Sequence, residues 1–244
     1  MIRQHLMGNT VVERNGFRWR AREVSRLEAL SDAVFGFAIT LLVVSLEVPG
    51  TADELFTAMR GFVPFAACFA LLFLVWYNQY RFFRRYGLND NVTVALNAAL
   101  LFVVLFFVYP LKFVFGLAVA MITGASATPV PVVEPGQWPW VMVIFSGGYI
   151  AVFGLFALLH VHAWRKRGEL ELNEVEVFDT VDNVRESLLN VAVAVVSVLL
   201  AVFGGEMGAF LAGMVYWLVG PIMTINGFAA ARARKRLTQR LAAG

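Results

Sequence analysis

The chain has 244 residues, of which 59% are hydrophobic and 15% are charged, and its formal net charge is +3. A mean hydropathy of +0.71 is far above that of a soluble domain, so the composition excludes one. The pI of about 9.2 would suit a nucleic-acid-binding protein, but the positive charges flank apolar segments, as in membrane proteins. We therefore expect a lipid bilayer as a partner and no nucleic acid.

Apolar runs of about 20 residues, each long enough to cross about 30 Å of hydrocarbon as a helix, recur along the chain. The runs are continuous rather than alternating, which disfavours a strand barrel. The sequence therefore predicts an all-α, polytopic membrane protein with six transmembrane helices. The six are expected at residues 27–48, 55–80, 92–119, 138–164, 184–203 and 207–230.

Basic residues gather at one side of this predicted arrangement. They lie before the first helix, after the second, after the fourth and after the sixth, and the opposite connections hold no Lys or Arg outside the spans. The positive-inside rule then puts both termini in the cytoplasm. We expect a cytoplasmic segment (1–26), a six-helix transmembrane domain (27–230) and a basic cytoplasmic tail (231–244) in a bacterial inner (plasma) membrane.

The first predicted helix carries polar groups that a lipid-facing helix would avoid. Asp32 follows Ser31 and lies about one and a half turns from Arg26, near the cytoplasmic end of the span. Such groups need partners, so they are expected to face a protein interior or water. Thr40 can return its hydroxyl to a backbone carbonyl one turn earlier or offer it to a hydrated ion.

An apolar seam runs down the same helix. Val34, Phe37, Leu41, Val44 and Val48 follow one another at spacings of three and four residues, which places them on one narrow face. Identical helices could meet along this seam. Spacing alone favours the simpler interpretation of ordinary helix packing.

At this helix the chain resembles the potassium channels related to transmembrane protein 175, the lysosomal potassium channel and its shorter bacterial relatives. The resemblance is carried by Arg26-x-x-x-Leu30-Ser31-Asp32, which is similar to the family's Arg-x-x-x-Phe-Ser-Asp signature. It extends to three further motifs, namely Trp76-x-x-Gln79-x-x-Phe82-Phe83, Leu96-Asn97 and Tyr109-Pro110. The six-span layout also agrees with that family.

The resemblance implies a potassium-permeable cation channel and a homotetramer, with the four first helices lining a central pore. The apolar pore constriction would be formed by Phe37, Leu41 and Val44, and Thr40 would support selectivity for K⁺. A structural polar network would hold the pore helices, with the members Arg26, Ser31, Asp32, Trp76 and Asn97. The family lacks a Thr-Val-Gly-Tyr-Gly filter. For this chain we expect no cofactor, no catalytic residues and no metal site other than transient K⁺ in the pore.

Three positions depart from the family pattern. Leu30 stands where the signature has Phe, Phe37 stands where Ile or Leu is usual, and Gln79 stands where many members have His. If the family's site applies here, the second departure is expected to change the pore aperture, and the third is expected to change the polar network at the end of the second helix.

Two other functions stay open on the residues alone. A proton-coupled or other secondary transporter could use Asp32 in the membrane, with His160 and His162 as relays, although the paired broken helices of many transporters are absent. A purely structural membrane protein is the other. An enzyme is disfavoured because no set of nucleophile, base or metal ligands converges in the spans, and a lone Cys68 cannot form an intrachain disulfide.

Overall fold

The fold is known from a computed structural model that describes residues 13, 16–21, 23–44, 50–123, 133–134 and 136–243. Within these ranges it leaves out the side chains of residues 44, 57, 58, 60, 122, 123 and 206. The regular elements of the described residues are all helices, which confirms the all-α prediction.

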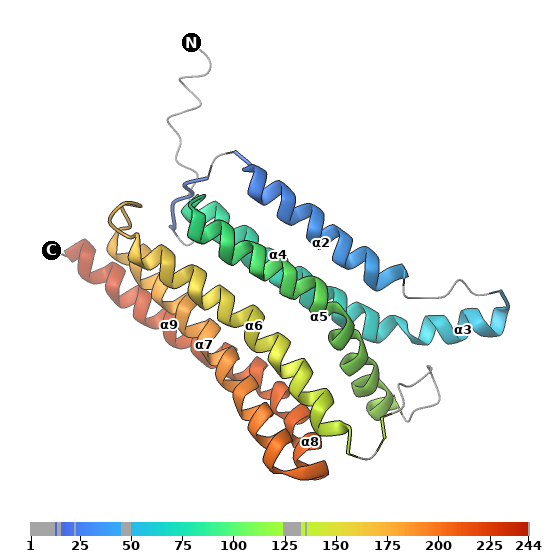
Figure 1. The fold of residues 1–244 in the computed structure, drawn as a ribbon. Helices are drawn as coiled ribbons and strands as arrows, with labels where there is room; N and C mark the ends of the chain where they lie inside the picture. Colours follow the sequence, from blue (N-terminus) through green and yellow to red (C-terminus); the bar gives the residue numbers. More distant parts are fainter. Residues whose placement is uncertain are drawn as a thin grey trace.

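In chain order the helices are α2 (Arg26–Val44), α3 (Ala52–Arg60), α4 (Phe62–Tyr86), α5 (Asn91–Thr123), α6 (Trp138–Arg165), α7 (Glu174–Phe203), α8 (Gly205–Met214), the 3₁₀ helix η1 (Val215–Leu218) and α9 (Val219–Ala243). The long helices lie side by side in an elongated bundle, with α2 at one edge and α9 at the opposite edge (Figure 1). The central pair α6 and α7 packs along most of its length.

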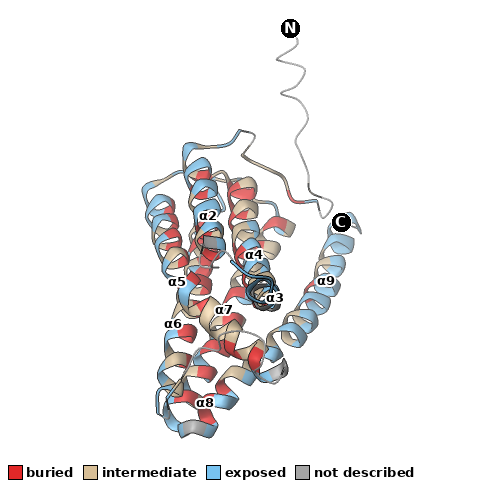
Figure 2. Ribbon diagram, turned by 90° about the vertical axis from the view of Figure 1, so that its right-hand side faces the viewer, coloured by how far each residue is buried: buried red, intermediate tan, exposed pale blue. Residues whose placement is uncertain are grey.

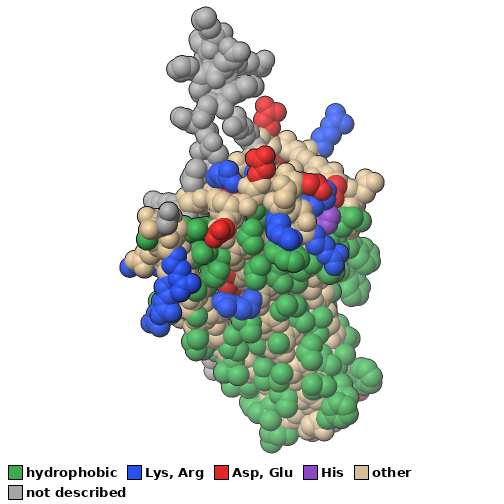
Figure 3. Space-filling view, turned by 90° about the vertical axis from the view of Figure 1, so that its left-hand side faces the viewer, with side chains coloured by type: hydrophobic (Ala, Val, Ile, Leu, Met, Phe, Trp, Pro, Cys, Tyr) green, Lys and Arg blue, Asp and Glu red, His purple; other side chains and the backbone are tan. Residues whose placement is uncertain are grey.

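Five helical stretches of the described chain are long and apolar enough to cross a membrane. They are Phe62–Tyr86, Asn91–Met121, Trp138–Arg165, Glu174–Phe203 and Met207–Ala243. Charged side chains gather at one end of the molecule, and hydrophobic side chains cover the rest of the visible face (Figure 3). The first predicted span, 27–48, extends beyond the described part of α2, so a sixth crossing stays an expectation.

The second span differs from the prediction of one helix over residues 55–80. It is two helices, α3 and α4, which meet at Gly61. Pro64 explains the break, because its ring has no N–H to donate and clashes with the carbonyl of Arg60 one turn earlier. The helix also continues past residue 80 to Tyr86, where Gly87 ends it in the left-handed conformation with φ of 61°.

Helix α7 begins ten residues before the predicted start at residue 184. The Asn173 side chain accepts a hydrogen bond from the Glu176 backbone N–H at 2.9 Å, and the Glu176 carboxylate accepts one from the Asn173 N–H at 3.1 Å. This capping box starts the helix at Glu174, so the acidic stretch that precedes the apolar run is part of the same helix.

The last predicted span is also interrupted. Residues 207–230 are divided among α8, the short 3₁₀ turn η1 and α9, and α9 runs on to Ala243. The residues expected as a basic tail therefore continue the helix, because their Ala, Arg, Lys, Leu and Gln side chains are all strong helix formers.

The segment before α2 is fixed to the charged end of the bundle. The backbone N–H groups of Arg20 and Ala21 donate to the Arg84 carbonyl at the end of α4. The guanidinium groups of Arg18 and Arg20 pair with the Glu176 carboxylate at 2.9 and 2.7 Å. These contacts tie the start of α2 to α4 and α7.

Candidate functional site

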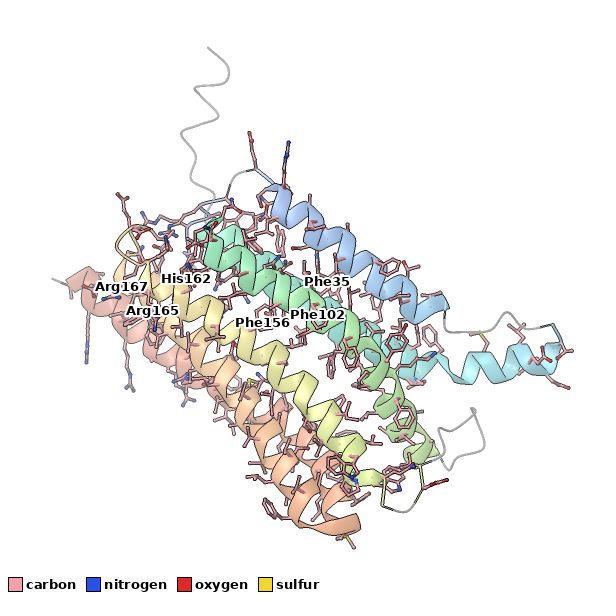
Figure 4. The ribbon with its side chains drawn as sticks, in the orientation of Figure 1. Phe35, Phe102, Phe156, His162, Arg165 and Arg167 are labelled. Carbon is pink, nitrogen blue, oxygen red and sulfur yellow. The ribbon has the colours of Figure 1, made fainter. Side chains whose placement is uncertain are left out.

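Helix α2 has one buried face and one open face. Phe35, Ala38 and Leu42 are at most 2% exposed and belong to the main hydrophobic core. Phe37, by contrast, is 58% exposed, and Thr40 is exposed beside it. In Figure 2 buried residues, drawn red, alternate along α2 with exposed residues, drawn pale blue, and Figure 4 labels Phe35 on this helix. The helix therefore packs on its own chain by one side only.

The predicted constriction residues lie on or beside the open face. Phe37 is fully on it, Leu41 is half-buried at its edge, and the side chain of Val44 lies outside the described residues. The Thr40 hydroxyl donates to the Gly36 carbonyl at 2.8 Å, which is the first of the two uses expected for it. Its oxygen keeps lone pairs that point away from the helix backbone.

The opposite side of α2 is held by a buried chain of polar groups. The Ser31 hydroxyl donates to the Leu27 carbonyl at 2.8 Å and accepts from the Asn97 amide of α5 at 2.9 Å. The Asn97 carbonyl in turn accepts from the Gln79 amide of α4 at 2.8 Å. All three side chains are at most 2% exposed, so this chain joins three helices away from water.

A second contact joins α2 to α4. The Trp76 indole N–H donates to the Asp32 carboxylate at 2.7 Å, so the charge of Asp32 has a hydrogen-bond partner although the residue is exposed. The predicted network is thus two groups, Ser31 with Asn97 and Asp32 with Trp76. Gln79 extends the first group. Arg26 is exposed, and its side chain forms no hydrogen bond or ion pair with another described side chain.

A further buried polar group, not singled out from the sequence, lies between α6, α7 and η1. The Ser146 hydroxyl is 3.0 Å from that of Ser197 and accepts from the Tyr216 hydroxyl at 2.9 Å. The Tyr149 hydroxyl donates to Asn190 at 2.7 Å. Hydroxyl and amide side chains inside apolar helices were the available signal, since such groups need partners within the protein.

The two histidines of α6 each have a local partner. The His160 ring is buried, and its Nδ1 lies 2.8 Å from the Phe156 carbonyl. His162 Nε2 lies 2.7 Å from the Asp90 carboxylate, at the same end of α6 as Arg165 and Arg167 (Figure 4). Burial alone would raise the pKa of Asp90, but hydrogen bonds from Thr93 and His162 outweigh it and lower the pKa to about 2.

Within the described residues, no three His, Cys, Asp or Glu side chains are grouped to hold a metal ion.

These features define a class of protein: a polytopic helical membrane protein. Its helix α2 carries polar side chains, packs on the rest of the chain by one face and is exposed on the other. Such a helix is suited to line a surface shared with other copies or with ions.

Comparison with known proteins identifies the family. The model of the endosomal/lysosomal potassium channel TMEM175 family matches residues 26–107, which contain the open helix and its polar partners. A potassium channel of Marivirga tractuosa is 37% identical over 240 residues, covering 94% of this chain and 97% of the relative. A potassium channel of Chamaesiphon minutus is 33% identical over 96 residues, covering 36% of this chain and 47% of the relative.

A solved structure agrees over most of the chain. The crystal structure of a threonine-to-alanine variant of the potassium channel MtTMEM175, in complex with a nanobody fusion protein, has a TM-score of 0.79 at 35% identity. The match covers 91% of this chain and all of that one (100%). The chain belongs to the TMEM175 potassium channel family, as the resemblance predicted, and its named relatives are channels rather than enzymes.

Proposed function

We propose that this chain is a potassium-permeable channel of a bacterial inner (plasma) membrane, built as a homotetramer of six-span protomers with both termini in the cytoplasm. The four copies of α2 surround the pore, and Phe37, Leu41 and Val44 form an apolar constriction with Thr40 beside it. Ion passage through such a ring is controlled by its width and wetting.

The open face of α2 is the observation that carries this proposal. A single α2 cannot enclose a pore, and its described neighbours cover only the side that holds Phe35, Ala38 and Leu42. Phe37 and Thr40 are left free to meet copies of themselves about a symmetry axis. In that arrangement the Thr40 hydroxyl oxygen faces the passing cation one turn from the Phe37 ring.

The buried hydrogen bonds that link Ser31, Asn97 and Gln79 keep the pore helix from rotating about its own axis. Turning α2 about its axis would break the 2.9 Å bond between Asn97 and Ser31 and leave buried polar groups unpaired. The Trp76 contact holds Asp32 at the cytoplasmic end in the same way. Both contacts therefore determine which face of α2 is directed toward the pore.

The channel works without a Thr-Val-Gly-Tyr-Gly filter. The nearest string in the sequence, Ser146-Gly147-Gly148-Tyr149, lies inside the continuous helix α6, and its Ser146 and Tyr149 side chains bond within the protomer. It is therefore part of the packing of α6 against α5 and α7. Discrimination among cations falls to the α2 ring.

The test is a flux assay on purified protein in liposomes under a potassium gradient. A channel gives passive potassium flux that dissipates the gradient without a coupled ion. Sodium and proton gradients serve as controls, because a secondary transporter using Asp32 would make potassium movement depend on one of them. Potassium flux that stops without a proton or sodium gradient would reject the channel proposal.

A further inference from the structure

Helix α9 has two opposite faces of different character. Its inner face packs on α7: Ala230 is 8% exposed, the Arg234 guanidinium donates to the Asp179 carboxylate at 2.7 Å, and Met223 sulfur lies 3.6 Å from the Asn190 amide. Positions 223, 230 and 234 are separated by seven and four residues and so share one side of the helix. The residues on the other side are exposed.

The outer face is apolar in its first half and basic in its second. Ile225 and Phe228 are 69% and 64% exposed. Arg232 continues the same side four residues after Phe228, and Lys235 and Arg236 follow it at spacings of three and four residues from Arg232; all three are exposed. We call the surface made of these five residues the α9 stripe.

The charged residues of this helix are all basic. Residues 207–244 contain four Arg and one Lys, and no Asp or Glu. Arg234 is paired with Asp179, whereas Arg232, Lys235, Arg236 and Arg240 make no ion pair with a described residue. The positive-inside rule accounts for basic residues at this end of the molecule, but it does not require them to continue an apolar face.

We propose that the α9 stripe binds an anionic phospholipid of the cytoplasmic leaflet. The acyl chains lie along Ile225 and Phe228, and the phosphate is bound by Arg232, Lys235 and Arg236. The match is one of shape and charge, because a phospholipid is apolar along its length and negative at one end, in the same order as the stripe.

The position of α9 favours a lipid over a second copy of the chain. It lies at the edge of the protomer away from α2, and it stands apart from α2, α4 and α5 in both views (Figures 1 and 2). This step depends on the proposed function: if α2 faces the central axis, α9 lies at the outer rim, where lipid is the neighbour. Lipid binding and potassium flux are therefore measured separately.

The experiment is native mass spectrometry of the purified tetramer with equal amounts of phosphatidylglycerol and phosphatidylcholine. We expect retention of phosphatidylglycerol in preference to phosphatidylcholine. Each basic residue at an anionic membrane surface contributes about fivefold to binding, so the double variant R232Q/R236Q should lose about twenty-five-fold in affinity for phosphatidylglycerol. The charge-preserving variant R232K/R236K should keep most of it.

The matched control is R165Q/R167Q, which removes two exposed arginines at the same end of the molecule, one in the last turn of α6 and one just after it. Its affinity for phosphatidylglycerol should change by less than about threefold. Equal losses in the two glutamine variants, no preference between the lipids, or displacement of the lipid by free glycerol phosphate would overturn the proposal. Potassium flux of R232Q/R236Q in phosphatidylcholine liposomes should equal that of the unmodified chain, which separates this test from that of the channel itself.

Discussion

The amide of Asn97 on α5 donates a 2.9 Å hydrogen bond to the hydroxyl of Ser31 on α2, and both side chains are fully buried. Ser31 is two helical turns from residue 38 and on the same buried side as Phe35. This bond therefore lies on the side of α2 that packs on its own chain, together with the buried Phe35 side chain. Phe37 and Thr40 lie exposed away from it.

Replacing Asn97 with Ala should lower the free energy of unfolding by about 1–3 kcal/mol, because Gln79 and Ser31 lose a buried partner. Thermal unfolding of the purified protein measures this. The control is Asn78→Ala, the same chemical change at a half-buried position of α4 next to Gln79. Equal destabilisation by the two substitutions would remove Asn97 from its proposed role.

Shortening Phe37 to Ala should raise potassium flux or relax selectivity against sodium, because a smaller ring of side chains widens the apolar constriction. Liposome flux with each cation measures the change. Phe102→Ala is the matched control, since Phe102 is 73% exposed on α5 and not on α2, the proposed pore helix. Equal flux through the unmodified protein, Phe37→Ala and Phe102→Ala would place Phe37 outside the pore.

Gly148 of α6 allows close packing against α5. A Cβ atom added there would overlap the ring of Phe107, whereas one added at Gly154 of the same helix meets nothing within 4 Å. Gly148→Ala should therefore lower stability by about 1–3 kcal/mol, while Gly154→Ala should not. The free energy of unfolding of the two variants, measured under the same conditions, tests this. A Gly148→Ala variant as stable as the unmodified protein would contradict the packing of α5 on α6.

Acid should weaken the contact between Asp90 and His162. The pKa of Asp90 is lowered to about 2 in the folded protein from a usual value of 3.8, so its contribution to stability is complete above the unfolded pKa and is lost as the pH falls toward 2. The melting temperature of the unmodified protein should fall between about pH 4 and pH 2, and that of Asp90→Asn should fall less steeply over the same range. An identical pH profile for the two proteins would contradict this assignment.

The sequence predicts much of the membrane architecture, because long apolar runs have few alternatives to a helix in a bilayer. The boundaries of α6 and the end of α7 follow the hydrophobic runs closely. Breaks inside the runs were missed at Gly61 and at η1, where the composition stays apolar while the backbone geometry changes. Hydropathy registers the polarity of side chains and is insensitive to such breaks.

The candidate site was predictable in part for a similar reason. Polar residues in apolar helices mark the need for partners, and Ser31, Asp32, Trp76 and Asn97 do find partners among themselves. Spacing could not show which of them pair, because that depends on how α2, α4 and α5 are rotated against each other. The pairing of Gln79 with Asn97 and the exposed position of Arg26 required the folded arrangement.

The central claim is that copies of α2 meet with Phe37 facing a shared pore. Cys68 is buried and is the single cysteine of the sequence, so a C68A background allows Phe37→Cys to be modified alone. Potassium flux through this variant in liposomes is measured before and after a charged thiol reagent, with Phe102→Cys as the control. The account predicts that modification at position 37 blocks flux and at position 102 does not. Flux that persists through a fully modified Phe37→Cys channel would contradict it.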